Sequence, residues 1–144
     1  MLERFAMINI RKETSVSIDD VLHLYQAVGW TNYTNQPQML EQSLAHSLAI
    51  YVARDGEEIV GLVRLVGDGF SSVFVQDLIV LPSYQRQGIG SDLMKEALGD
   101  YKDAYQVQLA TEQTEKTLGF YRSLGFETLS TYDCTGMIWV DRKK

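Results

Sequence analysis

Residues 73–91 constrain the fold of this chain most, because they place two glycines directly after an apolar strand and a proline. The stretch reads VFVQDLIVLPSYQRQGIGS and runs into a helical segment, SDLMKEAL. The first backbone N–H groups of a helix have no partner within it, and the helix dipole favours negative charge beside them. Gly88 and Gly90 also let a phosphate approach the backbone closely. The stretch therefore predicts a strand–loop–helix unit that binds an anion.

Two common phosphate-binding motifs do not match these glycines. A nucleoside triphosphatase loop needs Lys and then Ser or Thr after its last glycine, whereas Ser91 and Asp92 follow Gly90 here. A dinucleotide-binding fingerprint needs three spaced glycines near the start of a strand–helix–strand unit, and this loop carries only two. The remaining interpretation is a pyrophosphate held by the loop from Gln85 to Ser91.

The rest of the chain predicts a mixed sheet flanked by helices. Turn signals at Asp55-Gly56 and at Gly67-Asp68-Gly69 separate three apolar stretches, which we expect to form consecutive antiparallel strands. Ser17 with Asp20 resembles a capping box, and Thr114 can cap the last helix. The predicted helices are 17–28, 37–46, 88–100 and 114–124, and the predicted strands are 7–11, 47–53, 58–66, 73–81, 105–110, 126–130 and 137–140. A chain of 144 residues with this pattern is expected to form a single α/β domain.

Composition argues against several classes of protein. The net charge of −6 does not suit a nucleic-acid partner, and the only basic cluster is residues 142–144. No stretch reaches the ~18 apolar residues of a membrane span, and residues 1–13 lack the apolar core of a secretory signal. A lone cysteine, Cys134, suits a reducing compartment, so we expect a cytoplasmic protein. His23, His46 and Cys134 show no metal-ligand spacing, so we expect no metal.

Two motifs stand in a fixed order along the chain. The first, Gln85-Arg86-Gln87-Gly88-Ile89-Gly90, follows the strand that ends at Leu81-Pro82, and the second is Phe120-Tyr121-Arg122-Ser123-Leu124-Gly125-Phe126. They resemble the acetyl-CoA loop and the aromatic-Tyr, Gly-Phe motif of the GCN5-related N-acetyltransferase (GNAT) family. The resemblance covers the chain from about Ile8 to Val140. It implies an α/β fold around a mixed, mostly antiparallel sheet that is splayed between its fourth and fifth strands and flanked by helices.

The resemblance also implies that acetyl-CoA lies between the strands 73–81 and 105–110. The backbone of the first strand would bond the pantetheine amides as though the cofactor were an added strand. The loop amides would hold the pyrophosphate, and Arg86 either adds charge there or is an ordinary surface arginine. The expected cofactor contacts are Leu78, Ile79, Val80, Gln85, Arg86, Gln87, Gly88, Ile89, Gly90, Ser91, Thr114 and Tyr121.

Tyr121 matches the family tyrosine that protonates the departing CoA thiolate, a step that a phenol within reach can perform. Its other interpretation is packing in an amphipathic helix. Many relatives carry a Glu or His base at the positions of Gln76 and Phe74, and neither residue is a base here. Asp77 is the nearby carboxylate, although strand alternation points it to the face opposite Gln76. The candidate catalytic residues are therefore Tyr121, Asp77 and Gln76, with a water chain as the route for the amine proton.

The acceptor side is less constrained. Trp30 and Tyr33 lie between the first two helices, a region that often forms the wall of the acceptor pocket in the family, or they anchor the helix pair. The resemblance implies direct attack of a primary amine, which we expect to belong to a small molecule, on acetyl-CoA in a ternary complex. A protein or peptide amine is the enzymatic alternative, and a non-catalytic acyl-CoA-binding regulatory module is the other. A strand at 137–140 would present a sheet edge, which leaves room for a homodimer.

Overall fold

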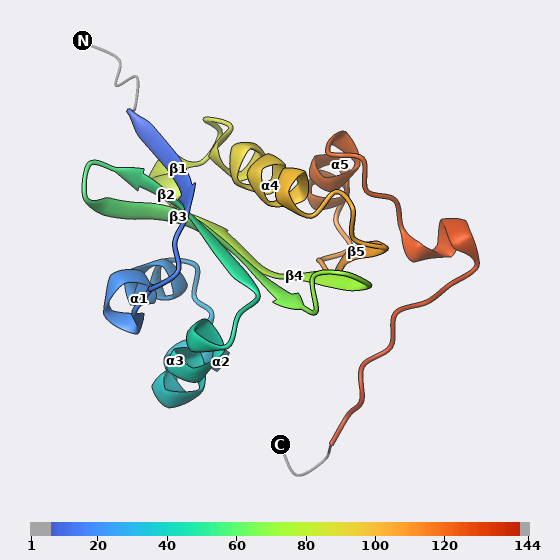
Figure 1. The fold of residues 1–144 in the computed structure, drawn as a ribbon, viewed down its shortest axis with the longest axis horizontal. Coiled ribbons are helices and arrows are strands. Elements are labelled where there is room, and N and C mark those ends of the chain that lie inside the picture. The colour runs from blue at the N-terminus through green and yellow to red at the C-terminus, as the bar shows by residue number, and fades with distance from the viewer. Residues whose placement is uncertain (1–6, 142–144) are drawn as a thin grey trace. The chain divides into compact units, whose positions relative to one another are not determined.

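The computed structural model describes residues 7–141 and contains a five-stranded sheet (Figure 1). In both chain order and spatial order, the strands are β1 (Ile8–Lys12), β2 (Ala49–Asp55), β3 (Glu58–Gly67), β4 (Ser72–Val80) and β5 (Gln106–Leu109). Strands β1 to β4 pair antiparallel, whereas β5 pairs parallel with β4. The prediction of an α/β fold with a mixed, mostly antiparallel sheet is confirmed.

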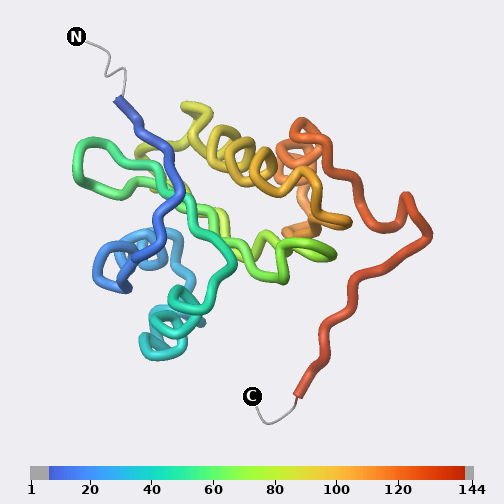
Figure 2. Tube along the Cα trace, in the orientation of Figure 1, coloured from blue at the N-terminus to red at the C-terminus, as the bar shows by residue number. Residues whose placement is uncertain are grey.

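Helices lie on both faces of this sheet. Those in the described residues are α1 (Ile18–Ala27), α2 (Thr31–Thr34), α3 (Pro37–Ala45), α4 (Ile89–Asp100) and α5 (Glu115–Ser123), with short 3-10 turns at Pro82–Tyr84 and Leu129–Tyr132. Helices α1 to α3 cover one face and α4 covers the other (Figures 1 and 2). The chain divides after Leu109 into two compact units, and α5 belongs to the second. None of the helices between residues 7 and 141 is long and apolar enough to cross a membrane.

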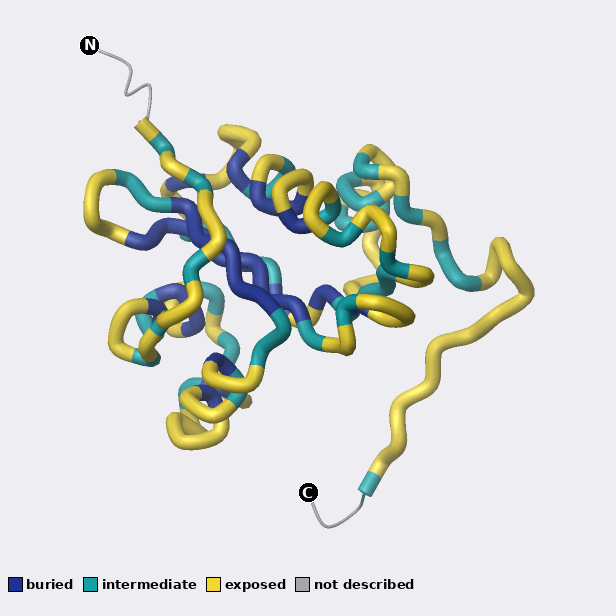
Figure 3. The backbone as a smooth tube through the Cα atoms, viewed as in Figure 1, coloured by how far each residue is buried: buried dark blue, intermediate teal, exposed yellow. Residues whose placement is uncertain are grey.

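An apolar core holds α1 and α3 against the sheet. Val21 and Leu24 on α1 recur at helical spacing, as do Leu40 and Leu44 on α3, and all four are buried. They belong to one cluster with the strand residues Ile50, Val52, Ile59, Leu62 and Ile79. Figure 3 shows the buried backbone of the first unit gathered on the strands and on the inward sides of its helices. This core places α1 and α2 beside β3 and β4, where the polar side chains described below meet.

On the opposite face, α4 approaches the sheet closely at Gly61 of β3. A Cβ atom at this position would lie 3.2 Å from Leu93 Cδ1 and 3.4 Å from Ile89 Cγ2. Ile89 is the first residue of α4 and is buried. Because Gly61 pairs with Val80, the start of α4 rests beside the end of β4.

Most elements lie close to their predicted ranges, and the exceptions have local causes. Thr114 caps α5 as expected, since its Oγ1 accepts a hydrogen bond from the Thr117 N–H at 3.1 Å. The predicted capping box at Ser17 and Asp20 is wrong, because the Ser17 side chain makes no capping bond and the Asp20 N–H donates to the Ser17 carbonyl instead. The sequence patterns did not predict α2, whose four residues TNYT are too few to show a helical period.

The two final strands predicted at 126–130 and 137–140 are wrong. Residues 129–132 form a 3-10 turn, and residues 133–141 form no regular element. Met137, Ile138, Trp139 and Val140 are between 72% and 95% exposed. Their composition favours a strand, but an extended segment becomes a strand only where a neighbouring edge accepts its backbone hydrogen bonds.

Candidate active site

Strand β4 contains an irregularity at Gln76. Asp77 pairs with Arg64, whereas Val75 pairs with Leu65, the next residue of β3, so Gln76 is an extra residue without a partner position. This is the pattern of a β-bulge, which leaves one residue unpaired and bends the strand. Burial nevertheless keeps alternating along β4, with Gln76 exposed between the buried residues Val75 and Asp77, which agrees with the prediction that Gln76 and Asp77 face opposite sides.

The pairing of β4 with β5 ends at the same place. Strand β5 pairs with Ser72–Val75 and with nothing beyond, so β4 continues past the bulge to Val80 without its β5 neighbour. The Leu81 N–H donates to the Val60 carbonyl, which shows that Leu81 directs its backbone groups toward β3. Since backbone groups alternate sides along a strand, those of Leu78 and Val80 point away from β3, toward the side of β4 that β5 leaves unpaired. We call this unpaired side of β4, from Gln76 to Val80, the opening. The predicted splay between the fourth and fifth strands is present.

The loop after β4 leads directly to the start of α4. Gly88 is the N-cap of α4 and has a φ of 80°, in the left-handed region that favours glycine. A Cβ atom added there would meet nothing within 4 Å, so the backbone beside the helix N-terminus is open. The side chains of Gln85, Arg86 and Gln87 are exposed, whereas Ile89 is buried. The loop can therefore receive an anion through its backbone N–H groups, and Ile89 can contribute only through its backbone.

One loop side chain already reaches the opening. Gln85 Nε2 donates a hydrogen bond to the Val80 carbonyl oxygen at 3.1 Å. This bond ties the loop to the end of β4 and occupies one of the two backbone acceptors that face the opening. A ligand that bonds the Val80 carbonyl must displace the Gln85 amide, while the Val80 N–H can be reached without that exchange.

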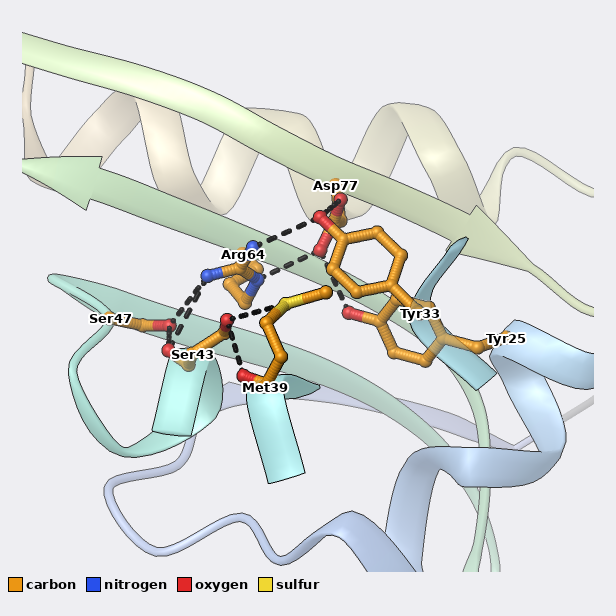
Figure 4. Close-up of polar contacts among 7 residues, drawn as sticks. All are labelled: Tyr25, Tyr33, Met39, Ser43, Ser47, Arg64 and Asp77. Atoms are coloured by element: carbon orange, nitrogen blue, oxygen red, sulfur yellow. Dashed lines mark hydrogen bonds and ion pairs between the residues drawn. The ribbon is translucent and has the colours of Figure 1, made fainter. Parts of the chain in front are cut away.

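A buried ion pair lies behind the bulge (Figure 4). Arg64 Nε of β3 donates to Asp77 Oδ2 of β4 at 2.8 Å, and the two side chains are 5% and 2% exposed. The remaining guanidinium nitrogens donate to the Tyr33 hydroxyl and to Ser47 Oγ, each at 3.2 Å, and to the Ser43 carbonyl. Two buried charges are tolerated here because their polar atoms are satisfied by hydrogen bonds.

Two tyrosines complete this cluster. Tyr25 of α1 and Tyr33 of α2 each donate a hydroxyl hydrogen bond of 2.9 Å to Asp77, one to each carboxylate oxygen. Burial raises the pKa of both phenols and the Asp77 carboxylate raises it further, so both remain protonated donors at neutral pH. Asp77 therefore binds a strand, two helices and a guanidinium together. We expect it to position Tyr33, with which it shares a hydrogen bond, and its sequence-based role as a base stays a prediction.

Tyr33 also belongs to an aromatic group with Tyr25 and Trp30. The ring centroids of Tyr25 and Tyr33 are 4.9 Å apart, and Trp30 lies 6.0 Å and 6.2 Å from them. Tyr33 is 8% exposed and Trp30 is partly exposed. The structure thus gives both residues a packing role between α1 and α2, and their role as an acceptor wall stays a prediction.

Tyr121 lies on α5, in the second unit. Its ring packs edge to face against Phe120 and Phe126, with centroids 5.0 Å and 5.9 Å apart. Burial raises the pKa of the Tyr121 phenol above its ordinary value, so the group keeps its proton through neutral pH. These contacts satisfy the packing interpretation and leave the phenol in the form required of a proton donor. The cofactor contact expected at Thr114 stays a prediction, because the structure gives that side chain its capping role.

Sequence reasoning missed Arg64 and Tyr25. A signal for Arg64 was available: it is the only charged residue inside the apolar run IVGLVRLV of β3, and a charge at such a position needs a buried partner. Tyr25 was assigned only to the apolar side of a helix. Across residues 7–141, no group of three His, Cys, Asp or Glu side chains is placed to hold a metal ion.

Comparison with known proteins agrees with this geometry. A model of the acetyltransferase (GNAT) domain matches residues 46–128. A solved structure, the acetyltransferase, GNAT family protein SP0256 from Streptococcus pneumoniae TIGR4, is 75% identical, with a TM-score of 0.88 over 94% of this chain and 99% of that one. A GNAT family acetyltransferase from Elizabethkingia anophelis with acetyl-CoA bound has a similar fold, with 23% identity and a TM-score of 0.61 over 83% of this chain and 76% of that one.

Among curated proteins, Serotonin N-acetyltransferase 2, chloroplastic, from Oryza sativa subsp. japonica is 27% identical over 120 residues. The matched region is 81% of this chain and 59% of the rice protein, so the chain spans less than two thirds of that relative's length. The similarity therefore reaches over most of this chain, while the rice protein has a further part that this chain does not match.

The buried cluster predicts that Asp77→Asn lowers the free energy of unfolding far more than an exposed change of the same kind. Removing one partner of a buried ion pair leaves the other uncompensated, which costs about 3–5 kcal/mol. Asp103→Asn, at an exposed position, is the matched control and should change stability by less than about 0.5 kcal/mol. Urea unfolding followed by circular dichroism measures both. Equal stability of the two variants would contradict the assigned role of Asp77.

Proposed function

This chain belongs to the acetyltransferase (GNAT) domain family, and we propose that it transfers an acetyl group from acetyl-CoA to a primary amine. One observation carries the proposal: β4 runs from Gln76 to Val80 without its β5 partner and then leads into a loop whose open backbone lies at a helix N-terminus. An extended amide chain that ends in a pyrophosphate matches both features. We further propose that residues 1–144 act as one domain. We also propose a cytoplasmic location, because a lone cysteine, Cys134, suits a reducing compartment.

The donor would lie along β4. Its pantetheine amides would bond the outward backbone groups of Leu78 and Val80, as a strand added to the sheet would. The pyrophosphate would accept hydrogen bonds from the N–H groups of residues 85–91, where the helix dipole favours negative charge. The exposed Arg86 guanidinium would add positive charge near it. The Gln85 amide would leave the Val80 carbonyl when the pantetheine bonds there.

The reaction would be a direct attack within a ternary complex. The amine nitrogen forms a bond to the thioester carbonyl carbon, the carbon–sulfur bond breaks, and Tyr121 supplies a proton to the departing thiolate. The nitrogen loses a proton as it becomes the amide, and an equivalent proton from water restores the Tyr121 phenol. The Val80 N–H would polarise the thioester carbonyl. A lysine-like ammonium has a pKa near ~10.4, so it must lose a proton before attack. Because Asp77 is buried and bonded, we propose that this proton leaves through water near the exposed, neutral Gln76.

We propose a small-molecule amine as the acceptor, with a protein or peptide amine as the alternative. The cluster of Asp77 and Tyr33 would hold the wall from which the acceptor approaches, and Trp30 would contribute its partly exposed ring. A specific observation favours a second function, a non-catalytic acyl-CoA-binding module. The residues near the bulge offer one neutral amide and one fully bonded carboxylate. Turnover of any amine decides between these functions.

Acetyl-CoA and CoA should raise the melting temperature, whereas ATP should not. A ligand at 100 times its Kd adds about 2.7 kcal/mol, which raises Tm by several degrees for a chain of this size. Arg86→Glu should reduce the shift, because it places a negative charge beside the pyrophosphate. Lys95→Glu is the control, since it makes the same charge change at an exposed position further along α4. No shift with millimolar acetyl-CoA would overturn the proposed donor site.

Tyr121→Phe should lower kcat by about 10²–10⁴, the range expected for loss of a general acid. Its KM for acetyl-CoA should change little, because Phe keeps the ring. Tyr132→Phe, at a 69% exposed position, is the matched control and should leave kcat unchanged. In the wild type, burial raises the pKa of the Tyr121 phenol, so the group keeps its proton through neutral and mildly alkaline pH and kcat should not fall there through its ionisation. An unchanged kcat in Tyr121→Phe would contradict the acid role.

A further inference from the structure

The Gln85 side chain occupies a backbone group that the proposed donor needs. Its Nε2 donates to the Val80 carbonyl oxygen at 3.1 Å, on the side of β4 where β5 is missing. An amide N–H that bonds a strand carbonyl makes the same contact as a neighbouring strand, and the amide N–H groups of pantetheine would make it too. The free protein therefore already holds a short mimic of the donor at the end of the opening.

The unpaired edge of β4 explains why this contact forms without a ligand. The backbone from Gln76 to Val80 has no β5 neighbour, and an open edge of this kind can pair with another chain. The Gln85 bond covers one of the open groups with a side chain from the same molecule. It thereby protects the end of β4 until a ligand arrives.

The loop has other bonds that keep its shape. The Tyr84 N–H donates to the Leu81 carbonyl at 2.8 Å. The Tyr84 side chain is 8% exposed, and its hydroxyl donates to the carboxylate of Asp55 at the end of β2. These bonds hold the backbone directly before Gln85, so the Gln85 side chain can leave Val80 while the loop stays in place.

The cost of breaking the Gln85 bond falls on one class of ligand. Gln85 is exposed, so water can replace the Val80 carbonyl as the partner of its amide when the side chain moves away. A ligand that bonds the Val80 carbonyl must force this exchange. A ligand that contacts only the N–H groups of residues 85–91 leaves the bond intact.

We propose that the Gln85 side chain competes with pantetheine for the Val80 carbonyl and so weakens the binding of every ligand that carries pantetheine. The binding of a nucleotide without pantetheine is not weakened. This inference rests on the proposed donor site and adds a control of its affinity. Because acetyl-CoA and the product CoA share the pantetheine, the competition lowers the affinity for both and hastens release of the product.

Gln85→Met removes the competing donor and keeps the length of the side chain. Its Kd for CoA, measured by calorimetry, should be about threefold to tenfold lower than that of the wild type, the range that corresponds to one hydrogen bond. Its Kd for adenosine 3′-phosphate 5′-diphosphate, the part of CoA without pantetheine, should stay unchanged. Gln85→Ala should act in the same direction, which separates the loss of the bond from a new contact by Met.

Gln36→Met is the matched control, because it removes an equivalent bond elsewhere in the first unit. Gln36 Nε2 donates to the Asn32 carbonyl at 3.0 Å, and its side chain is also exposed. This variant should bind CoA and the nucleotide as the wild type does.

Three results would overturn the proposal. An unchanged Kd for CoA in Gln85→Met would show that the bond does not compete, and a higher Kd would show that the bond shapes the loop for the ligand. A Kd that falls equally for CoA and for the nucleotide would show that the gain does not involve pantetheine. Absence of CoA binding in the wild type and in Gln36→Met would instead refute the donor site itself, so the two failures are distinguishable.

Nuclear magnetic resonance then reports the exchange directly. The side-chain amide signals that are missing from Gln85→Met identify this group in the wild type. In the free protein these protons should show nuclear Overhauser contacts with Val80 and Leu81. Saturating CoA should abolish the contacts, whereas the nucleotide should leave them in place. Contacts that persist in the CoA complex would contradict the exchange.

Discussion

Arg64 and Asp77 place opposite charges on adjacent strands, in a region that water barely reaches. Removing two such ions from water costs several kcal/mol each, and only good geometry with further hydrogen bonds offsets that cost. Tyr25 and Tyr33 supply bonds to the carboxylate, and Ser47 supplies one to the guanidinium. A slip of β4 by one residue would leave both charges unpaired, so the pair fixes the register on one side of the bulge. Through Tyr25 and Tyr33, helices α1 and α2 are hydrogen-bonded to the same Asp77 carboxylate.

The opening in the sheet depends on that register. Gln76 is the extra residue between the Asp77 pairing and the Val75 pairing, and β5 stops at Val75. Beyond this point, β4 can offer the backbone groups of Leu78 and Val80 to a ligand. Gly61 lets α4 rest on the sheet nearby, so the helix N-terminus lies beside the end of β4. A buried ion pair, a bulge and a close helix contact thus place one extended and one anion-binding surface side by side.

Local signals in the sequence predicted much of this. The Asp55-Gly56 hairpin, the cap at Thr114 and the glycine loop before α4 each depend on residues near one another in the chain. The Arg64–Asp77 pair depends on strand register, which no local pattern records, and the bulge at Gln76 has no sequence signal of its own. The strand predicted at 137–140 failed for a related reason. Strand propensity describes a segment, whereas a strand requires an edge that the same segment cannot specify.

Hydrogen–deuterium exchange with and without acetyl-CoA tests the central claim most directly, because it reports on the backbone groups to which the claim refers. The account predicts slower exchange at Leu78, at Val80 and through residues 85–91 when acetyl-CoA is present. It predicts no comparable change along β1, which lies at the other edge of the sheet. Unchanged exchange at Leu78, Val80 and the loop, under conditions where acetyl-CoA is bound, would contradict it.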